Sequence, residues 1–162
     1  MRRFFVILIL SSLLLCSCGT RSFGILSYQE KSIRAECTLN SEYKIEITKE
    51  NGGGRVSFLE PSELSYISFS INDECVTATS GEVTITMEKE SATGILAIFN
   101  IFSLDEAELC TAKSNGEYTL MEFSNEYGIY TLTLGKNSLP KRVKIASSTY
   151  TFDISVDAIS LS

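Results

Sequence analysis

Short segments in which apolar and polar residues alternate recur along most of the chain, and this pattern constrains the fold more than any other feature. Tyr43, Ile45 and Ile47 alternate with polar residues, and Val83 and Ile85 do the same further along. An alternation with a period of two places the apolar side chains on one face of a β-strand. The sequence therefore predicts a mainly β protein.

Turn signals separate these segments. The run Asn-Gly-Gly-Gly at residues 51–54 is the strongest of them, and Asn115-Gly116 is another. Pro61 also interrupts the pattern because proline cannot donate a backbone hydrogen bond, and we expect one helical turn over residues 61–64. Connections this short are typical of antiparallel hairpins. The strands that we expect span residues 23–39, 42–49, 55–60, 67–71, 75–79, 83–88, 110–114, 117–123, 127–134, 139–146 and 150–156.

One segment departs from the alternation. Over residues 91–102, apolar side chains recur every three or four positions, which predicts a helix. The helix is apolar nearly all round, which suits burial against the concave face of a sheet. Two interpretations stay open: a helix that only fills the core, and a helix that lines a ligand cavity.

These elements together predict the fold class. We expect a mainly β (α+β) protein, with an incomplete antiparallel barrel or strongly curved sheet of about 10–11 strands packed on one main helix. No linker divides the chain and no clear repeat is present, so residues 23–162 form one domain in this prediction.

The first 17 residues have the character of a secretory signal. Arg2 and Arg3 precede apolar runs at residues 4–10 and 13–15, after which the composition changes abruptly. Residues 15–18, Leu-Cys-Ser-Cys, resemble the cleavage box of bacterial lipoproteins. The resemblance implies a signal peptide at residues 1–17, a lipid (palmitate among its acyl chains) on Cys18, and a tether at residues 18–22. An ordinary secreted protein cut nearby is the alternative.

The lipid anchor and the charge bound the location and the partners. Two or three acyl chains hold a protein stably on a membrane, so the resemblance places the domain at the extracytoplasmic face of the cell membrane. The net charge of the whole chain is −6, and removal of Arg2 and Arg3 with the signal makes it more negative. An acidic domain without a basic cluster argues against a nucleic-acid partner.

The chain contains no histidine, which rules out Ser-His-Asp and Cys-His nucleophile systems and histidine-ligated metals. Three acid pairs have the chemistry for acid–base catalysis or Ca²⁺ binding, but each falls where solvated charge is expected. We therefore expect no enzyme activity, no cofactor and no metal site. The pairs are Asp73/Glu74, Glu106/Glu108 and Asp153/Asp157.

Three cysteines remain in the domain once Cys18 carries lipid. Cys37, Cys75 and Cys110 are too far apart in sequence for a zinc knuckle or a CxxC redox pair. Two interpretations stay open: three separate thiols acting as small apolar residues, or one disulfide and one free thiol.

Two short motifs resemble the LolA/LolB-like lipoprotein carriers and related small lipoproteins of Gram-positive anaerobes. The first is Phe-Leu-Glu-Pro-Ser-Glu-Leu at residues 58–64, followed by the strand at residues 67–70. The second is the Gly-Lys-Asn-Ser-Leu-Pro-Lys-Arg-Val turn and strand at residues 135–143. The likeness spans residues 23–156. It implies a half-barrel around a helix, enclosing an apolar pocket that takes acyl chains.

Two functions follow as expectations. In the first, the lipoprotein binds a lipid or other apolar ligand in the concave face of the sheet. In the second, it is a non-enzymatic interaction or scaffolding module of the cell envelope, with a filled core and a protein partner on its Ser/Thr-rich outer face. For the first function, the candidate cavity residues are Phe69, Ile71, Ile85, Met87, Ile98 and Phe102.

Overall fold

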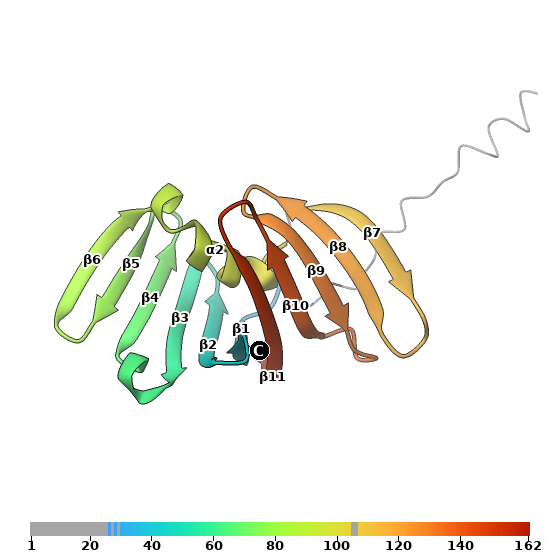
Figure 1. The fold of residues 1–162 in the computed structure, drawn as a ribbon, viewed down its shortest axis with the longest axis horizontal. Helices are drawn as coiled ribbons and strands as arrows, with labels where there is room; N and C mark the ends of the chain where they lie inside the picture. The colour runs from blue at the N-terminus through green and yellow to red at the C-terminus, as the bar shows by residue number, and fades with distance from the viewer. Residues whose placement is uncertain (1–25, 27, 29, 105–106) are drawn as a thin grey trace, which may run out of the picture.

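The computed structural model describes residues 26, 28, 30–104 and 107–162, and it contains one 11-stranded antiparallel sheet (Figure 1). The strands in chain order are β1 Ile33–Leu39, β2 Tyr43–Glu50, β3 Gly53–Glu60, β4 Ile67–Asn72, β5 Cys75–Ser80, β6 Val83–Glu88, β7 Glu108–Ser114, β8 Thr119–Asn125, β9 Gly128–Leu134, β10 Pro140–Ala146 and β11 Thr151–Leu161.

The strand order is β6-β5-β4-β3-β2-β1-β11-β10-β9-β8-β7. Strands β1 to β6 build one half of the sheet outward from its centre, and β7 to β11 build the other half inward from the far edge. The halves meet where β1 pairs with β11. Because β6 and β7 lie at opposite edges, the sheet is not closed into a barrel, and the predicted curved sheet packed on a helix is confirmed.

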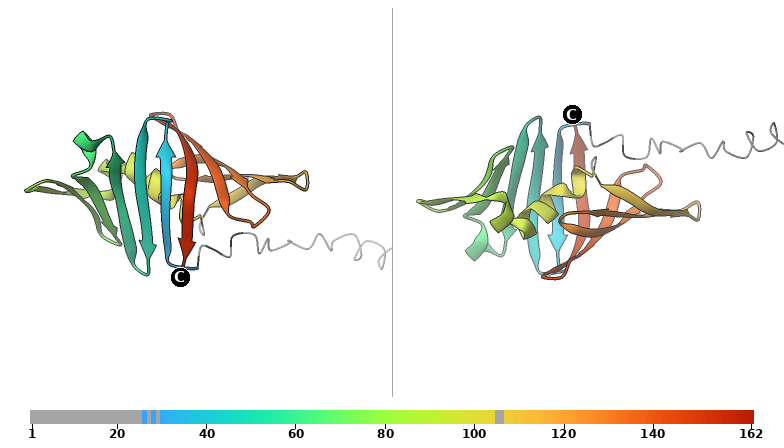
Figure 2. Two further views of the ribbon diagram at one scale, coloured as in Figure 1. Left: turned by 90° about the horizontal axis from the view of Figure 1, so that it is seen from below. Right: turned by 90° about the horizontal axis from the view of Figure 1, so that it is seen from above.

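A helical segment links β6 to β7 and carries the chain from one edge of the sheet to the other. It consists of the 3-10 turn η3 (Lys89–Ser91), the helix α2 (Thr93–Phe99) and the 3-10 turn η4 (Asn100–Phe102). The helix predicted over residues 91–102 is therefore present, but only its middle is α-helical. The segment crosses one face of the central strands, as the right-hand view of Figure 2 shows. We call this face the inner face.

The core lies between the helical segment and the inner face of the sheet. Alternate residues of the central strands point into it, as the period-two pattern requires. On β1, for example, Ile33, Ala35, Cys37 and Leu39 are buried and Arg34 is exposed. The helical segment contributes Leu96, Ala97, Ile98, Phe99, Ile101 and Phe102, all of which are buried.

The first strand is shorter than the sequence predicts. Strand β1 begins at Ile33, and none of the described residues before it is in a strand. The N–H of Lys31 donates to the carbonyl of Tyr28 (3.1 Å), which forms a turn ahead of the strand. The Tyr28 ring is buried edge-on against Phe102, with the ring centroids 6.3 Å apart. Packing of Tyr28 into the core therefore replaces the expected extension of the sheet.

The expected connections are present. A 3-10 turn, η2 (Ser62–Leu64), follows Pro61 as predicted. At the β7–β8 hairpin, the Asn115 side-chain oxygen accepts hydrogen bonds from the N–H groups of Glu117 and Tyr118, both at 3.0 Å. Among the described residues, no helix is both long and apolar enough to cross a membrane.

Candidate functional site

The helical segment is held tightly on the middle of the inner face. The ring of Phe99 packs against Gly54 of β3, which has no side chain. A Cβ at Gly54 would lie 2.5 Å from Phe99 Cε2. At the other end of the segment, the Lys49 ammonium donates to the carbonyl of Phe102 (3.0 Å). The middle of the inner face is therefore filled by the protein itself.

Beyond the helical segment, the inner face continues outward as a row of apolar side chains across β1 to β6. The strand register places these residues side by side: Ala35, Ile47, Val56, Phe69, Ala78 and Ile85. We call this set the apolar row.

Burial along the apolar row falls steadily toward the edge. Ala35 and Ile47 are fully buried and Val56 is 1% exposed, whereas Phe69 is half-buried and Ile85 is 57% exposed. Val83, which lies on the same face of β6, is 60% exposed. Large exposed apolar side chains that continue a core outward mark a binding surface more often than scattered ones do. The outer end of the apolar row is therefore the candidate binding surface.

The opposite half of the inner face is apolar in the same manner. Leu109 of β7 lies opposite Phe123, and Ala112 lies opposite Met121. Phe123 and Met121 are buried, whereas Leu109 and Ala112 on the edge strand are exposed. Both ends of the inner face therefore present apolar side chains that the helical segment does not cover.

The outer face of the sheet carries mainly charged and hydroxyl side chains. Three ion pairs join neighbouring strands there: Arg34 with Glu46, Lys44 with Glu60, and Arg142 with Asp153. On the strands nearest β6, the outward positions are occupied by serine and threonine, including Ser68, Ser70, Thr77, Thr79, Thr84 and Thr86. Leu120 and Ile129 are exposed apolar side chains on the outer face as well, but on the strands nearest β6 the inner face is apolar and the outer face is polar.

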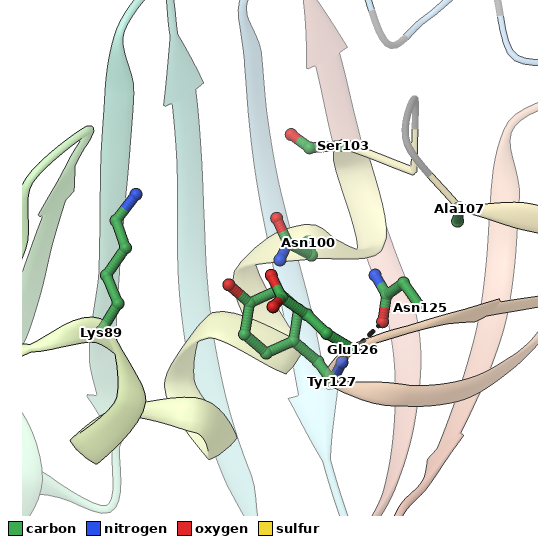
Figure 3. A pocket seen from close by; sticks show the side chains of 7 residues that line it. All are labelled: Lys89, Asn100, Ser103, Ala107, Asn125, Glu126 and Tyr127. Carbon is green, nitrogen blue, oxygen red and sulfur yellow. Dashed lines mark hydrogen bonds between the residues drawn. The ribbon is translucent and has the colours of Figure 1, made fainter.

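A polar pocket of about 600 Å³ opens beside the helical segment (Figure 3). The Asn125 side-chain oxygen accepts a hydrogen bond from the Tyr127 N–H (2.9 Å) and orders this rim. Burial, together with the Glu126 carboxylate and the charge of Glu90, raises the pKa of the Tyr127 hydroxyl to about 12. The lining residues are Lys89, Asn100, Ser103, Ala107, Asn125, Glu126 and Tyr127.

A second pocket of about 260 Å³ adjoins the first and shares Lys89, Asn100, Ser103 and Tyr127 with it. Leu96, Phe99 and Ile71 bring apolar surface to this second pocket. The two pockets form a polar rim along one side of the helical segment. This rim suits a polar group, whereas the apolar row suits a hydrocarbon.

The structure brings together four of the six cavity residues predicted from the sequence. Phe69 and Ile85 lie in the apolar row, separated by Ala78. Ile71 and Met87 lie on the same face in the next row, separated by Val76. The other two, Ile98 and Phe102, are buried in the helical segment. Cys18 lies outside the described residues.

Some residues of the candidate site were not predicted. Val83 belongs to the same alternation as Ile85 and Met87, so the periodicity of β6 was enough to identify it. The polar rim had no such signal. The residues that line the first pocket come from η3, from η4 and the link that follows it, and from the end of β8 with the turn after it. Only the crossing of the helical segment brings these parts together.

The three described cysteines are free thiols on different strands, and no disulfide joins them. Cys37 is buried on β1, where burial and the charges of Asp157 and Glu36 raise its pKa to about 12. Cys75 is half-buried on β5, and Cys110 is exposed on β7. The structure therefore agrees with the interpretation of three separate thiols.

The acid pair Asp153/Asp157 forms surface contacts. Asp153 accepts two hydrogen bonds from the Arg142 guanidinium, one of them from Nε at 2.7 Å. Asp157 accepts a hydrogen bond from the Thr38 hydroxyl (2.7 Å). Among the described residues, no group of three or more His, Cys, Asp or Glu side chains is placed to hold a metal ion.

Comparisons with known proteins concern the fold. No protein-family model matches the chain, and no curated protein matches it. An uncharacterised conserved protein from Thermus thermophilus, known from its crystal structure, resembles the chain with a TM-score of 0.52 and 14% identity, over 85% of each chain. This similarity supports the same overall fold. A LolA superfamily protein from Nitrosomonas europaea has a TM-score of 0.45 and 10% identity, over 86% of this chain and 92% of its own.

Proposed function

We propose that this chain is a non-enzymatic lipoprotein, anchored through Cys18 at the extracytoplasmic face of a cell membrane, that binds a lipid or other apolar ligand on the inner face of its sheet. One observation carries the binding role: the apolar row runs without interruption from the buried core to Ile85, which is 57% exposed. A hydrocarbon chain laid along its outer end would cover Ile85 and Val83 and contact Phe69.

The ligand surface in this proposal is an exposed apolar surface at the outer end of the apolar row, not a closed cavity. The middle of the inner face is filled by residues such as Phe99 and Phe102; of the two pockets beside it, the first is mostly polar and the second is lined by both polar and apolar residues. An acyl chain would therefore lie between the helical segment and the β6 edge. A polar end of the same ligand would face the rim of Lys89, Asn100 and Tyr127 beside the helical segment.

The chemistry of the sequence supports the anchor and the location. The lipoprotein box at residues 15–18 supplies a lipid attachment site, and the motifs at residues 58–64 and 135–143 resemble carriers of acyl chains. A domain tethered at a membrane surface is close to a supply of lipid. Both inferences rest on the sequence resemblance.

A fluorescent fatty acid tests the binding role, with two neighbouring residues of β6 as a matched pair. Ile85→Asn places an amide on the inner face, and Thr84→Asn places the same amide on the outer face. Both side chains are mostly exposed, so neither change should alter stability by more than about 1 kcal/mol. Loss of about half of an isoleucine contact costs about 1 kcal/mol, so Ile85→Asn should weaken probe binding about fivefold.

Thr84→Asn should leave the affinity for the fatty acid unchanged. Equal affinities for the two variants would show that the apolar row is not the ligand surface. No measurable probe binding by the unaltered chain would reject the binding role altogether.

The filled middle of the inner face favours a second function, an interaction or scaffolding module of the envelope. Ala97, Ile101 and Phe102 are fully buried, so this part of the fold leaves no room for a guest. In that case a protein partner would use the surface of the sheet or its edges. The two functions differ in their ligand, and the fatty-acid assay separates them.

A further inference from the structure

The two edges of the sheet differ in how they are protected. Strand β7 pairs with β8 through an irregular register between Leu109 and Thr111, and it carries Lys113 near its end. Bulges and lysines are the features by which edge strands avoid pairing with other chains. The β7 edge is therefore protected against pairing with a strand of another chain.

Strand β6 has neither feature. Its register with β5 is regular from Val83 to Glu88, and the strand contains no proline, lysine or arginine. Every side chain of the strand is exposed except Met87, which is half-buried. A regular, exposed and β-prone edge is a template for another strand.

The hairpin geometry shows which backbone groups are available. Ser80 pairs with Val83 across a two-residue turn, and Gly81 at its first position has φ +60. The two residues that flank such a turn exchange two backbone hydrogen bonds. Further along the hairpin, pairs that are hydrogen-bonded to each other alternate with pairs that are not. The N–H and C=O groups of Val83, Ile85 and Met87 therefore face β5. Those of Thr84, Thr86 and Glu88 face away from the sheet.

The charges at this edge select among partners. Glu82 lies in the turn just before β6 and Glu88 is the last residue of the strand; both are exposed and form no ion pair with any described residue. The neighbouring Lys89 lines the polar pockets. A second copy of this chain, paired about Ile85, would place Glu82 opposite Glu88 twice, and like charges directly opposite each other destabilise a strand pair.

We propose that the β6 edge docks an extended segment of a partner protein, antiparallel to β6, with basic residues at its two ends and apolar residues at alternate positions between them. The basic residues lie opposite Glu82 and Glu88 on the outer face. The apolar residues lie opposite Val83, Ile85 and Met87 and cover the exposed end of the apolar row. Backbone hydrogen bonds to Thr84, Thr86 and Glu88 supply the rest of the affinity.

Fluorescently labelled peptides and the full chain in a mild detergent test this docking. The peptide KVTVTVK matches the edge in charge and alternation, and EVTVTVE keeps the alternation and reverses the charge. The basic peptide should bind at least about tenfold more tightly at low salt, and this preference should shrink as salt is added. Equal binding of the two peptides would overturn the proposal that the partner segment has basic ends opposite Glu82 and Glu88.

Thr86→Pro removes a backbone donor that faces away from β5, and Thr86→Ser keeps this donor while changing the same side chain. Thr86→Pro should weaken binding of KVTVTVK about tenfold, and Thr86→Ser should not change it. A version of the peptide N-methylated at alternate residues tests the same hydrogen bonds without any change in the protein, and it should not bind. Full binding by this peptide would overturn the edge as the docking site.

Self-association is the competing outcome. Sedimentation should show that the unaltered chain and Thr86→Pro have the same oligomeric state. A dimer that Thr86→Pro dissociates would overturn the proposal in favour of a second copy at this edge. The docked segment and the lipid would use neighbouring side chains of β6, but only the segment needs the backbone groups of the edge. Thr86→Pro should therefore leave fatty-acid binding intact, and this difference separates the two proposals.

Discussion

Gly54 of β3 lies directly under the ring of Phe99 on α2, where an added Cβ would come within 2.5 Å of Phe99 Cε2 and would also overlap the carbonyl oxygen of Thr48. The glycine is therefore a point of close contact between the helical segment and the sheet. The position of the helical segment, and with it the filled middle of the inner face, depends on this missing side chain.

Substitution of Gly54 by alanine should destabilise the fold. The new methyl group must displace an aromatic ring and a backbone oxygen, and overpacking of this kind costs about 1–3 kcal/mol. Thermal unfolding should show a midpoint lower by several degrees. Gly94→Ala is the matched control, because its Cβ would meet nothing nearer than 3.7 Å and would lie in a helix that favours alanine. An unchanged midpoint for Gly54→Ala would show that the helical segment does not rest on Gly54.

The ion pair between Arg142 and Asp153 should give a pH-dependent contribution to stability. The hydrogen bonds from Arg142, together with the charges of Arg142 and Lys144, lower the pKa of Asp153 in the folded state. A carboxylate whose pKa is lowered by folding stabilises the protein above its unfolded pKa, and this stabilisation is lost as the pH falls through the folded pKa.

Arg142→Gln should therefore lower the unfolding midpoint slightly at pH 7 and progressively less below about pH 4. Lys136→Gln removes the same charge from an exposed turn and serves as the control for net charge. A destabilisation by Arg142→Gln that stays constant down to pH 2 would mean that the contact with Asp153 is not its source.

The three thiols should differ in reactivity. Cys110 is exposed and should react within minutes with a thiol reagent at pH 8, whereas Cys37 is buried with its pKa raised to about 12 and should react only after unfolding. Mass spectrometry after timed labelling counts the modified thiols. Cys110→Ser should remove the fast phase. Two unreactive cysteines in the denatured, unreduced protein would instead indicate a disulfide.

The lipid anchor is tested by one substitution. Cys18→Ser removes the sulfur to which the lipid would be attached, so the protein should move from the membrane fraction to the soluble one. Cys16→Ser changes the neighbouring cysteine and should leave the protein in the membrane fraction. If Cys18→Ser also stays with the membrane, the anchor lies elsewhere.

Local patterns predicted the elements of this fold well, because each depends on a few neighbouring residues. The alternation around Ile45 and around Ile85 gave β2 and β6, and the three- and four-residue spacing around Ile98 gave the helix. Those patterns also placed Phe69, Ile71, Ile85 and Met87 on one face.

Long-range relationships could not be predicted in the same way. β1 can pair with β11 only because the helical segment carries the chain from the β6 edge to the opposite edge, where β7 begins. No local sequence pattern predicts this crossing. The first strand was predicted too long for a related reason. Tyr28 has strand character by itself, but contact with Phe102, distant in sequence, places it in the core. The polar rim around Asn100 and Tyr127 likewise exists only because turns from separate elements meet.

The central claim is that the inner face of the sheet binds a lipid or other apolar ligand, and native mass spectrometry of the full chain, extracted from its own membranes, tests it most directly. The expected result is a population heavier than the protein by the mass of one non-covalently bound lipid. Added fatty acid should displace this lipid, and Ile85→Asn but not Thr84→Asn should deplete it. Recovery of only the unliganded mass, with no uptake of added fatty acid, would contradict the claim.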